Sequence, residues 1–285
     1  MTDSTIRTRH VQALGLRTRV LEVGPADTDE AVVFIHGGGK SADDWTGVMP
    51  RLGTFARGVA FDLPGFGHAD KPAGWSGYNA PGWATFTAAA LDRLGVQRAH
   101  LVLHDAGGEA GLLWALAHPR QLASVVLINS GNLIGYRWHL LARMHRVPVL
   151  GFLIALGGRI GLASVLRFYE PRLPSTAVAR WRDEFRWGAR RSLLRFYRAT
   201  AAPGGVRLAD ELKALHRPVL IIWGSENRFV PAEQALRQRD SFPAAEIVVV
   251  EKTGHYTHLE APDQVCELMV PFLRSQMRPT ESEPT

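Results

Sequence analysis

The chain has 285 residues, of which 46% are apolar, and this is enough for one large α/β domain with an insertion. Its net charge is +6, but the 33 basic residues, mostly Arg, are scattered and form no long run of like charge. This distribution argues against a nucleic-acid-binding protein. The single cysteine, Cys266, excludes an internal disulfide, and its apolar helical surroundings indicate a buried thiol.

The sequence gives no sign of export or of a membrane span. The first residues, "MTDSTIRTRHVQ", contain no apolar core of a signal peptide. The most apolar segment, "VPVLGFLIALGG", is about ten residues too short to cross a bilayer. We therefore expect a soluble, cytoplasmic protein with no membrane partner.

The predicted elements alternate between strands and helices along the chain. A hairpin around Gly15 opens it, because "RHVQALGLRTRVLEVG" alternates polar and apolar residues. Six continuous apolar runs then predict buried strands, at 31–36, 56–64, 99–104, 122–129, 217–224 and 245–251. Helical patterns lie between most of them, for example at 82–95, 108–119 and 231–240. This order predicts an α/β fold with a mostly parallel sheet flanked by helices.

One long interval lacks a strand pattern. From 132 to 212 the chain reads as helical and rich in Arg and aromatic residues, which predicts an inserted helical cap. The core then consists of 1–131 and 213–277, and the polar end, 278–285, is expected to be a disordered tail. Such a cap covers the carboxyl edge of the sheet, where open α/β sheets bind ligands.

A carboxylate stands at the junction of a strand and a helix in "LVLHDAGGEAGLLWAL". A strand, a tight turn with small neighbours and a helix make up a nucleophile elbow, and the helix N-terminus favours negative charge. The serine version of this turn, G-x-S-x-G, is absent from the chain. Asp105 is therefore the candidate nucleophile, and a helix-capping aspartate is the alternative interpretation.

Five motifs resemble those of the α/β-hydrolase superfamily, within it the haloalkane dehalogenases and epoxide hydrolases. They are "VVFIHGGG", "FDLPGFGHADKP", "LHDAGG", "VLIIWGSENRFVP" and "VVEKTGHYTHLEAPDQV", in the family's order along nearly the whole chain. The resemblance implies an α/β-hydrolase fold and two-step covalent catalysis.

In that scheme Asp105 attacks an electrophilic carbon and forms an ester, which a water activated by His255 hydrolyses. The backbone N–H groups of Gly38 and Ala106 are expected to stabilise the oxyanion of the second step. His258 is the fallback base, and His104 is expected to pack beneath the turn.

The residue that matches the triad acid is an amide. Asn227 stands where the family carries Asp, and Asn129 occupies the alternative position after the sixth strand. An amide orients an imidazole, but it cannot stabilise an imidazolium and can select the wrong tautomer. The neighbouring Glu226 is the remaining candidate acid.

The positions of the leaving-group donors favour an epoxide over a halide. Haloalkane dehalogenases resemble one another in the two side chains that hold the departing halide: a Trp directly after the nucleophile, and an Asn or Trp after the glycine of the oxyanion turn. This chain has Ala106 and Gly38 at these positions. A Trp from the cap would therefore have to replace one of the two halide donors. Epoxide hydrolases protonate the ring oxygen with cap tyrosines, and the insertion offers Tyr136, Tyr169 and Tyr197. The "HGGG" turn instead resembles that of esterases and lipases.

The insertion also contains a basic, aromatic cluster. Its members are Arg180, Arg182, Arg186, Arg190 and Arg191, interleaved with Trp181, Phe185 and Trp187. This pattern is typical of a solvated amphipathic helix, and the alternative is a lid that recruits an anionic or aromatic substrate.

Together these residues predict an epoxide hydrolase-like enzyme with the set Asp105, His255 and Asn227, and with no cofactor or metal. The alternatives are a haloalkane dehalogenase, an ester or lactone hydrolase, a non-hydrolytic cyclase or lyase that needs no water step, and a pseudo-enzyme that binds a small molecule. We expect an apolar or aromatic small-molecule substrate. The sequence predicts no oligomeric state.

Overall fold

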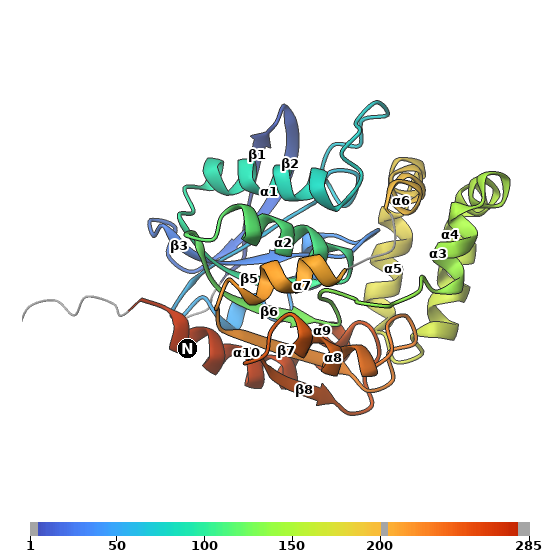
Figure 1. The fold of residues 1–285 in the computed structure, drawn as a ribbon. Helices are drawn as coiled ribbons and strands as arrows, with labels where there is room; N and C mark the ends of the chain where they lie inside the picture. The colour runs from blue at the N-terminus through green and yellow to red at the C-terminus, as the bar shows by residue number, and fades with distance from the viewer. Residues whose placement is uncertain (1–4, 201–204, 279–285) are drawn as a thin grey trace, which may run out of the picture.

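The computed structural model describes residues 5–200 and 205–278, and its centre is a single eight-stranded sheet (Figure 1). The strand order is β1-β2-β4-β3-β5-β6-β7-β8. The strands are β1 (Arg7–Ala13), β2 (Leu16–Val23), β3 (Glu30–Ile35), β4 (Arg57–Phe61), β5 (Arg98–His104), β6 (Leu122–Ile128), β7 (Val219–Gly224) and β8 (Glu246–Val250).

The pairing of the strands confirms the predicted α/β class. β1 and β2 form the expected antiparallel hairpin, with Ala13 opposite Leu16, and β2 pairs antiparallel with β4. From β4 through β3, β5, β6 and β7 to β8, each strand is parallel to the next one in the sheet. Most of the parallel strands are buried along nearly their whole length because both faces of the sheet are covered.

Helices cover the two faces and divide the core into two parts. One part packs α1 (Ala80–Leu94), α2 (Ala106–Ala117), α7 (Val206–Lys213) and α8 (Glu233–Arg237) on the sheet. The other packs α10 (Pro262–Gln276) and two short 3-10 helices, η1 (Ala42–Trp45) and η2 (Met49–Arg51). Alternate residues of one strand serve different parts, as in β5, where Leu101 and Leu103 face the first core and Val102 the second.

The interval between β6 and β7 is helical, as the sequence predicts. It contains α3 (Leu140–Arg146), α4 (Pro148–Tyr169), α5 (Ser175–Glu184), α6 (Trp187–Ala199) and α7. We call residues 132–212 the insertion; its helices α3 to α6 stand beside the sheet on the right of Figure 1. Within α4, Gly158 interrupts the helix with a φ of 67°.

Three expectations from the sequence can be compared with the structure near the end of the chain and in the insertion. Cys266 is buried in α10, and burial raises the pKa of its thiol to about 11. The predicted disordered tail begins at Arg278, but this residue is held by contacts to Asp29 and Glu30, so the prediction of disorder is wrong for it. The rest of the predicted tail, 279–285, lies outside the described residues. Among the described helices, none is by itself long and apolar enough to span a bilayer, although α3 and Pro148–Gly158, bent by 111°, meet that criterion together.

Candidate active site

Asp105 lies at a strained corner where β5 ends and α2 begins. Its φ of 50° and ψ of −132° are unusual for a residue other than glycine. The corner closes because its neighbours are small: a Cβ at Gly107 would lie 2.4 Å from the backbone oxygen of His36. The Ser130 hydroxyl donates to the Asp105 carbonyl at 2.7 Å and supports the turn. This geometry is that of a nucleophile elbow, as the sequence predicts.

Two donors hold the Asp105 carboxylate. The backbone N–H of Gly38 donates to Oδ1 at 2.9 Å, and His255 Nε2 lies 3.0 Å from Oδ2. Burial raises the pKa of Asp105, but the hydrogen bond from His255, aided by the Ala106 N–H, outweighs it and leaves the pKa well below its ordinary value. The carboxylate is therefore charged at neutral pH and lies against the two predicted oxyanion donors.

His255 is held by its backbone in the loop after β8. Its carbonyl oxygen accepts hydrogen bonds from His104 Nε2 and from Asn129 Nδ2, both at 2.9 Å. Its N–H donates to Glu170 Oε2 at 3.0 Å. His104 thus packs beneath the turn, as expected, and burial lowers its pKa to about 3. These contacts place the His255 ring between Asp105 and Asn227.

Asn227, in the loop after β7, meets the other nitrogen of the ring. Its Nδ2 lies 3.1 Å from His255 Nδ1 and donates to Asn129 Oδ1 at 3.0 Å. Its Oδ1 accepts the backbone N–H groups of Phe229 and Val230, at 3.0 and 2.9 Å. Two backbone donors require an acceptor, so the amide oxygen must point at them and the NH₂ group at His255.

The orientation of this amide determines the tautomer of His255. Asn129 adds to the constraint because its own Oδ1 accepts the Gly224 N–H at 2.9 Å and is therefore an acceptor toward Asn227. An NH₂ donor facing His255 Nδ1 requires a lone pair there, so the ring proton lies on Nε2 and is donated to Asp105. In this state Nε2 is a hydrogen-bond donor and cannot accept a proton from water.

The other candidate partners lie away from the ring. Glu226 is half-exposed and forms an ion pair with Arg172, so it does not replace the missing acid in this structure. His258 stacks on Trp45 with ring centroids 4.5 Å apart, and in the described part of the chain neither of its nitrogens has a hydrogen-bond partner. It lies behind His104, which makes it unsuitable as the fallback base.

A small cavity opens in front of Asp105. Its volume is about 50 Å³. It lies between α2, the loop after β6, α6 and the loop after β7, and its lining is mainly apolar and aromatic. Those groups include Leu133, Tyr136, Trp138, Phe196, Tyr197, Phe229 and Val230. An apolar or aromatic substrate therefore matches the lining, and one of more than a few atoms requires the insertion to move.

The three predicted tyrosine donors have different surroundings. Tyr136 lines the cavity, but its hydroxyl already donates to the Phe229 carbonyl at 2.8 Å. Tyr197 lines it too, and its hydroxyl has no hydrogen-bond partner among the described residues; burial raises its pKa above the ordinary value. Tyr169 stacks on Phe229, outside the cavity, so the prediction that it faces the site is wrong. It ends α4 on the far side of that ring.

The arginine cluster spans two helices rather than one and stays outside the cavity. The turn at Phe185 separates α5 from α6. Arg180 pairs with the buried Asp44, Arg190 donates to the Ala155 carbonyl, and Arg191 donates to the Lys71 carbonyl. In the described cavity lining there is no Arg or Lys. The cluster therefore anchors the insertion and does not reach the site.

Sequence reasoning missed Glu170, which ends α4 and supports the His255 loop. It is buried, its Oε2 accepts the His255 N–H, and it lies beside the Glu260 carboxylate, whose Oε2 accepts the Gly254 N–H at 2.9 Å. Burial, and then the charge of Glu260, raise the pKa of Glu170 to about 8. No motif marks this residue, because its partner is a backbone N–H distant in sequence.

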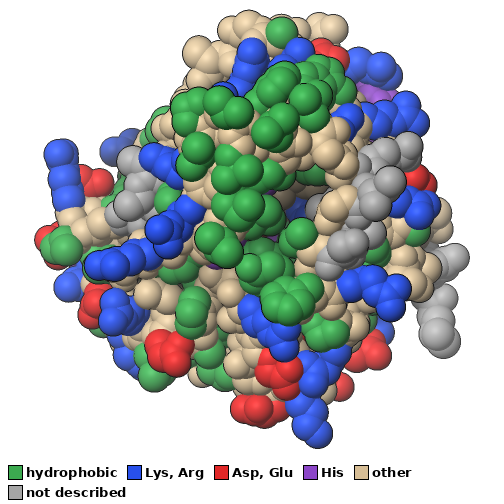
Figure 2. Space-filling view, turned by 90° about the vertical axis from the view of Figure 1, so that its right-hand side faces the viewer, with side chains coloured by type: hydrophobic (Ala, Val, Ile, Leu, Met, Phe, Trp, Pro, Cys, Tyr) green, Lys and Arg blue, Asp and Glu red, His purple; other side chains and the backbone are tan. Residues whose placement is uncertain are grey.

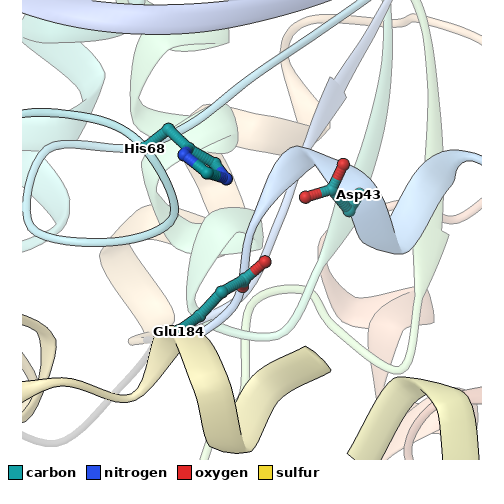
Figure 3. A group of neighbouring side chains, drawn as sticks. All are labelled: Asp43, His68 and Glu184. Atoms are coloured by element: carbon teal, nitrogen blue, oxygen red, sulfur yellow. The ribbon is translucent and has the colours of Figure 1, made fainter. Parts of the chain in front are cut away.

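One group of side chains has the composition of a metal site. Asp43, His68 and Glu184 have donor atoms within 4.8 Å of one another, where η1, the loop after β4 and the end of α5 meet (Figure 3). Arg19 donates to Asp43 at 2.6 Å, and burial raises the pKa of Glu184 to about 7. A guanidinium already satisfies one carboxylate and the other is partly protonated near neutral pH, so the group fits a cation poorly.

Comparisons with known proteins agree with the fold. The profile of the alpha/beta hydrolase fold family matches residues 30–262. A 2-hydroxy-6-oxononadienedioate/2-hydroxy-6-oxononatrienedioate hydrolase of Burkholderia vietnamiensis is 29% identical and aligns over 96% of this chain and 100% of its own.

Solved structures of two other kinds of enzyme share the architecture. The epoxide hydrolase CorEH has a TM-score of 0.82 at 20% identity, over 96% of this chain and 100% of its own. A haloalkane dehalogenase DbeA variant from Bradyrhizobium elkanii has a TM-score of 0.81 at 21% identity, over 95% of this chain and 97% of its own. The family profile spans most of the chain, and the sheet, elbow and histidine loop agree with it. The chain therefore belongs to the alpha/beta hydrolase fold family.

Proposed function

We propose that this protein opens the epoxide of a small apolar or aromatic molecule by forming a covalent ester on Asp105. The observation that carries this proposal is the Asp105 carboxylate itself, held at a strained elbow between the Gly38 N–H and His255 Nε2. A carboxylate at this position attacks a saturated carbon, whereas the sequence relative is named as a hydrolase of a dienedioate. We therefore assign the chemistry from the site.

The reaction has two steps. In the first, an oxygen of Asp105 bonds to one ring carbon of the epoxide, the carbon–oxygen bond of the ring breaks, and the ring oxygen takes a proton from the Tyr197 hydroxyl. In the second, water attacks the ester carbonyl while His255, in the less favoured tautomer that leaves Nε2 without a proton, accepts a proton from this water, and the N–H groups of Gly38 and Ala106 stabilise the oxyanion. Collapse of this intermediate releases a diol and restores the carboxylate; the proton of the water returns to Tyr197.

Two features of the site favour an epoxide over a halide. Ala106 and Gly38 offer no side-chain donor to a departing halide ion. Tyr197 lines the same cavity as Asp105, and no hydrogen bond of its hydroxyl is found among the described residues. We also propose that the insertion serves as the cap of the site, since Phe196 and Tyr197 of α6 form part of the cavity wall.

A second function is favoured by the Asn227 amide. With its proton on Nε2, His255 suits a reaction that needs a charged Asp105 and a neutral donor and does not need a base for water. A cyclase or lyase meets this description: Asp105 takes a proton from one atom of the substrate and returns it to the rearranged product or its leaving group, His255 keeps its own proton, and no ester forms.

Intact-protein mass spectrometry after incubation with epoxide and haloalkane panels tests the proposal. We expect an epoxide adduct whose mass equals that of protein plus substrate, located on the peptide that contains Asp105 and absent from Asp105→Asn. A haloalkane adduct, with loss of the halide, would support the dehalogenase. Conversion of substrate without any adduct would contradict ester formation and support the cyclase or lyase.

A further inference from the structure

In the first half of α4, large apolar side chains face the solvent, whereas in a water-soluble domain they normally face the core. Val149, Phe152, Leu153 and Leu156 share one face at helical spacing, and they are 71, 47, 56 and 52% exposed. The small residues face inward instead, as at Ala155, which is 3% exposed. Burial of the large side chains would normally stabilise the fold, so this exposed face calls for an apolar partner.

The inward face is small because α4 approaches α3 closely. A Cβ at Gly151 would lie 2.2 Å from the backbone oxygen of His145, so a larger residue cannot be accommodated there. Arg190 of α6 donates to the Ala155 carbonyl at 2.9 Å, and Arg198 donates to the Pro148 carbonyl at 2.6 Å. The outward direction of the large side chains is therefore fixed by the packing of α3, α4 and α6 on one another.

The exposed groups form one continuous surface. We define the apolar ridge as the exposed hydrophobic residues of this region, which are Val147, Val149, Leu150, Phe152, Leu153, Leu156 and Trp187. Trp187, at the start of α6, extends it beyond α4 because its ring lies 6.3 Å from that of Phe152. In Figure 2, which faces the insertion, hydrophobic side chains gather in the upper and central part, with Lys and Arg side chains beside them.

The helices that carry the apolar ridge are basic, although Asp183 and Glu184 end α5 shortly before Trp187. The sequences of α3, α4 and α6 contain no Asp or Glu, and between Glu109 and Glu170 the chain has six Arg and no acidic residue. Arg143 and Arg146 end α3 directly before the ridge, and both are exposed. An apolar strip bordered by Arg matches a bilayer surface with anionic headgroups, into which apolar side chains insert while Arg side chains stay at headgroup level.

The same charge disfavours a second copy of the chain as the partner. A two-fold dimer through the apolar ridge would place the same surface against itself, so the arginines of both copies would meet without acidic partners. We propose that α3, α4 and α6 dock this protein on anionic phospholipid surfaces. The inner side of α6 lines the cavity in front of Asp105 through Phe196 and Tyr197, so docking brings the cavity close to apolar molecules dissolved in the bilayer. This proposal differs from the expectation, drawn from the sequence, of no membrane partner.

Co-sedimentation with vesicles tests the proposal on the full chain. We expect binding to vesicles of phosphatidylcholine with phosphatidylglycerol, release of the protein at high salt, and little binding to phosphatidylcholine alone. Leu153→Glu combined with Leu156→Glu should weaken binding about tenfold or more. Leu236→Glu, at a residue of α8 that is 63% exposed, is the matched control and should bind as the unmodified protein does.

A charge variant separates the two parts of the surface. Arg143→Gln should weaken binding about fivefold, the equivalent of about 1 kcal/mol, whereas Arg93→Gln on α1 should have no effect. Circular dichroism and turnover of a water-soluble substrate confirm that each variant is folded. Absence of binding to anionic vesicles at low salt would overturn the proposal. A second result would also overturn it: light scattering shows a dimer, the double variant Leu153→Glu with Leu156→Glu dissociates this dimer, and the unmodified protein does not bind vesicles.

Discussion

The two nitrogens of the His255 ring face opposite kinds of partner. At Nε2 lies a charged carboxylate on a strained elbow, with a backbone donor at its second oxygen. At Nδ1 lies the NH₂ group of Asn227, held in that direction by two backbone N–H groups and by Asn129. The Nε2 side is suited to forming a bond to carbon. The Nδ1 side lacks the negative charge that helps a histidine to activate water, so the two steps of the reaction should differ in rate.

Removing the nucleophile should have the largest effect. Asp105→Asn keeps the shape of the elbow but replaces the attacking oxygen with a neutral amide, so we expect turnover to fall about a thousandfold or more. Steady-state rates with a substrate found in the epoxide panel measure this. Near-normal turnover by the folded variant would remove Asp105 from the mechanism.

His255→Gln should separate the two steps. Attack by Asp105 needs no base, so adduct formation should change by less than about tenfold, while ester breakdown should slow by about a hundredfold. The adduct should therefore accumulate, which intact-mass spectra over time would record. Loss of adduct formation in a folded variant would mean that His255 acts in the first step.

Tyr197→Phe tests the proposed acid. Removing a proton donor should slow opening of epoxides by about a hundredfold and leave reaction with haloalkanes nearly unchanged. Tyr169→Phe is the matched control because Tyr169 stacks on Phe229 outside the cavity. Equal losses in both variants, or for both substrate classes, would contradict the role given to Tyr197.

Asn227→Asp should raise the rate of ester breakdown by about tenfold and leave ester formation unchanged, because a carboxylate at Nδ1 moves the ring proton away from Nε2. The structure sets a limit on this gain: Asn129 Oδ1 lies 3.0 Å from the substituted atom and would repel a carboxylate oxygen. Asn129→Ser with Asn227→Asp should therefore be faster than Asn227→Asp alone. Single-turnover rates of the unmodified protein, Asn227→Asp, Asn129→Ser and the double variant measure the coupling, and NMR of the ring nitrogens reports the tautomer.

The opposite outcome is equally informative. Unchanged ester breakdown in both Asp variants, with the ring proton shifted to Nδ1, would show that water activation does not limit the reaction. A proton already on Nδ1 in the unmodified protein would contradict the amide orientation.

Glu170→Gln should have the smallest effect, on stability. The pKa of Glu170 is raised to about 8, so between its ordinary value and about pH 8 the folded state binds the extra proton. The free energy of unfolding should then fall as pH rises through this window, by at most about 1.4 kcal/mol per pH unit. Gln resembles the protonated acid, and the variant should lose this slope. Denaturant unfolding at pH 5 and at pH 8 checks it, and an unchanged slope would contradict the assignment.

Much of the core is predictable from the sequence because its signals are local. Continuous apolar runs predict the parallel strands, and a carboxylate between such a run and a glycine-rich helix start predicts the elbow at Asp105. The amide at Asn227 is likewise visible in the sequence. Its orientation is not, because that depends on two backbone N–H groups and on Asn129, which only the folded loops bring together.

The insertion is less predictable, for a physical reason. Its helical periodicity is clear, but the direction in which each side chain points depends on how the helices pack on one another. Three tyrosines therefore look equivalent in sequence, while only Tyr136 and Tyr197 reach the cavity. The outward face of α4 likewise follows from the close contact at Gly151 and not from the apolar pattern. Glu170 acts on a backbone N–H, for which no sequence signal exists.

The origin of the product oxygen tests the central claim most directly. In a single turnover with excess enzyme in heavy-oxygen water, an ester on Asp105 gives its own carboxylate oxygen to the diol, and the label from water enters the Asp105 side chain. The account predicts an unlabelled first-turnover product, a labelled Asp105 peptide, and an adduct that forms faster than it decays. Label in the first-turnover product, with none in the Asp105 peptide, would contradict covalent catalysis by Asp105.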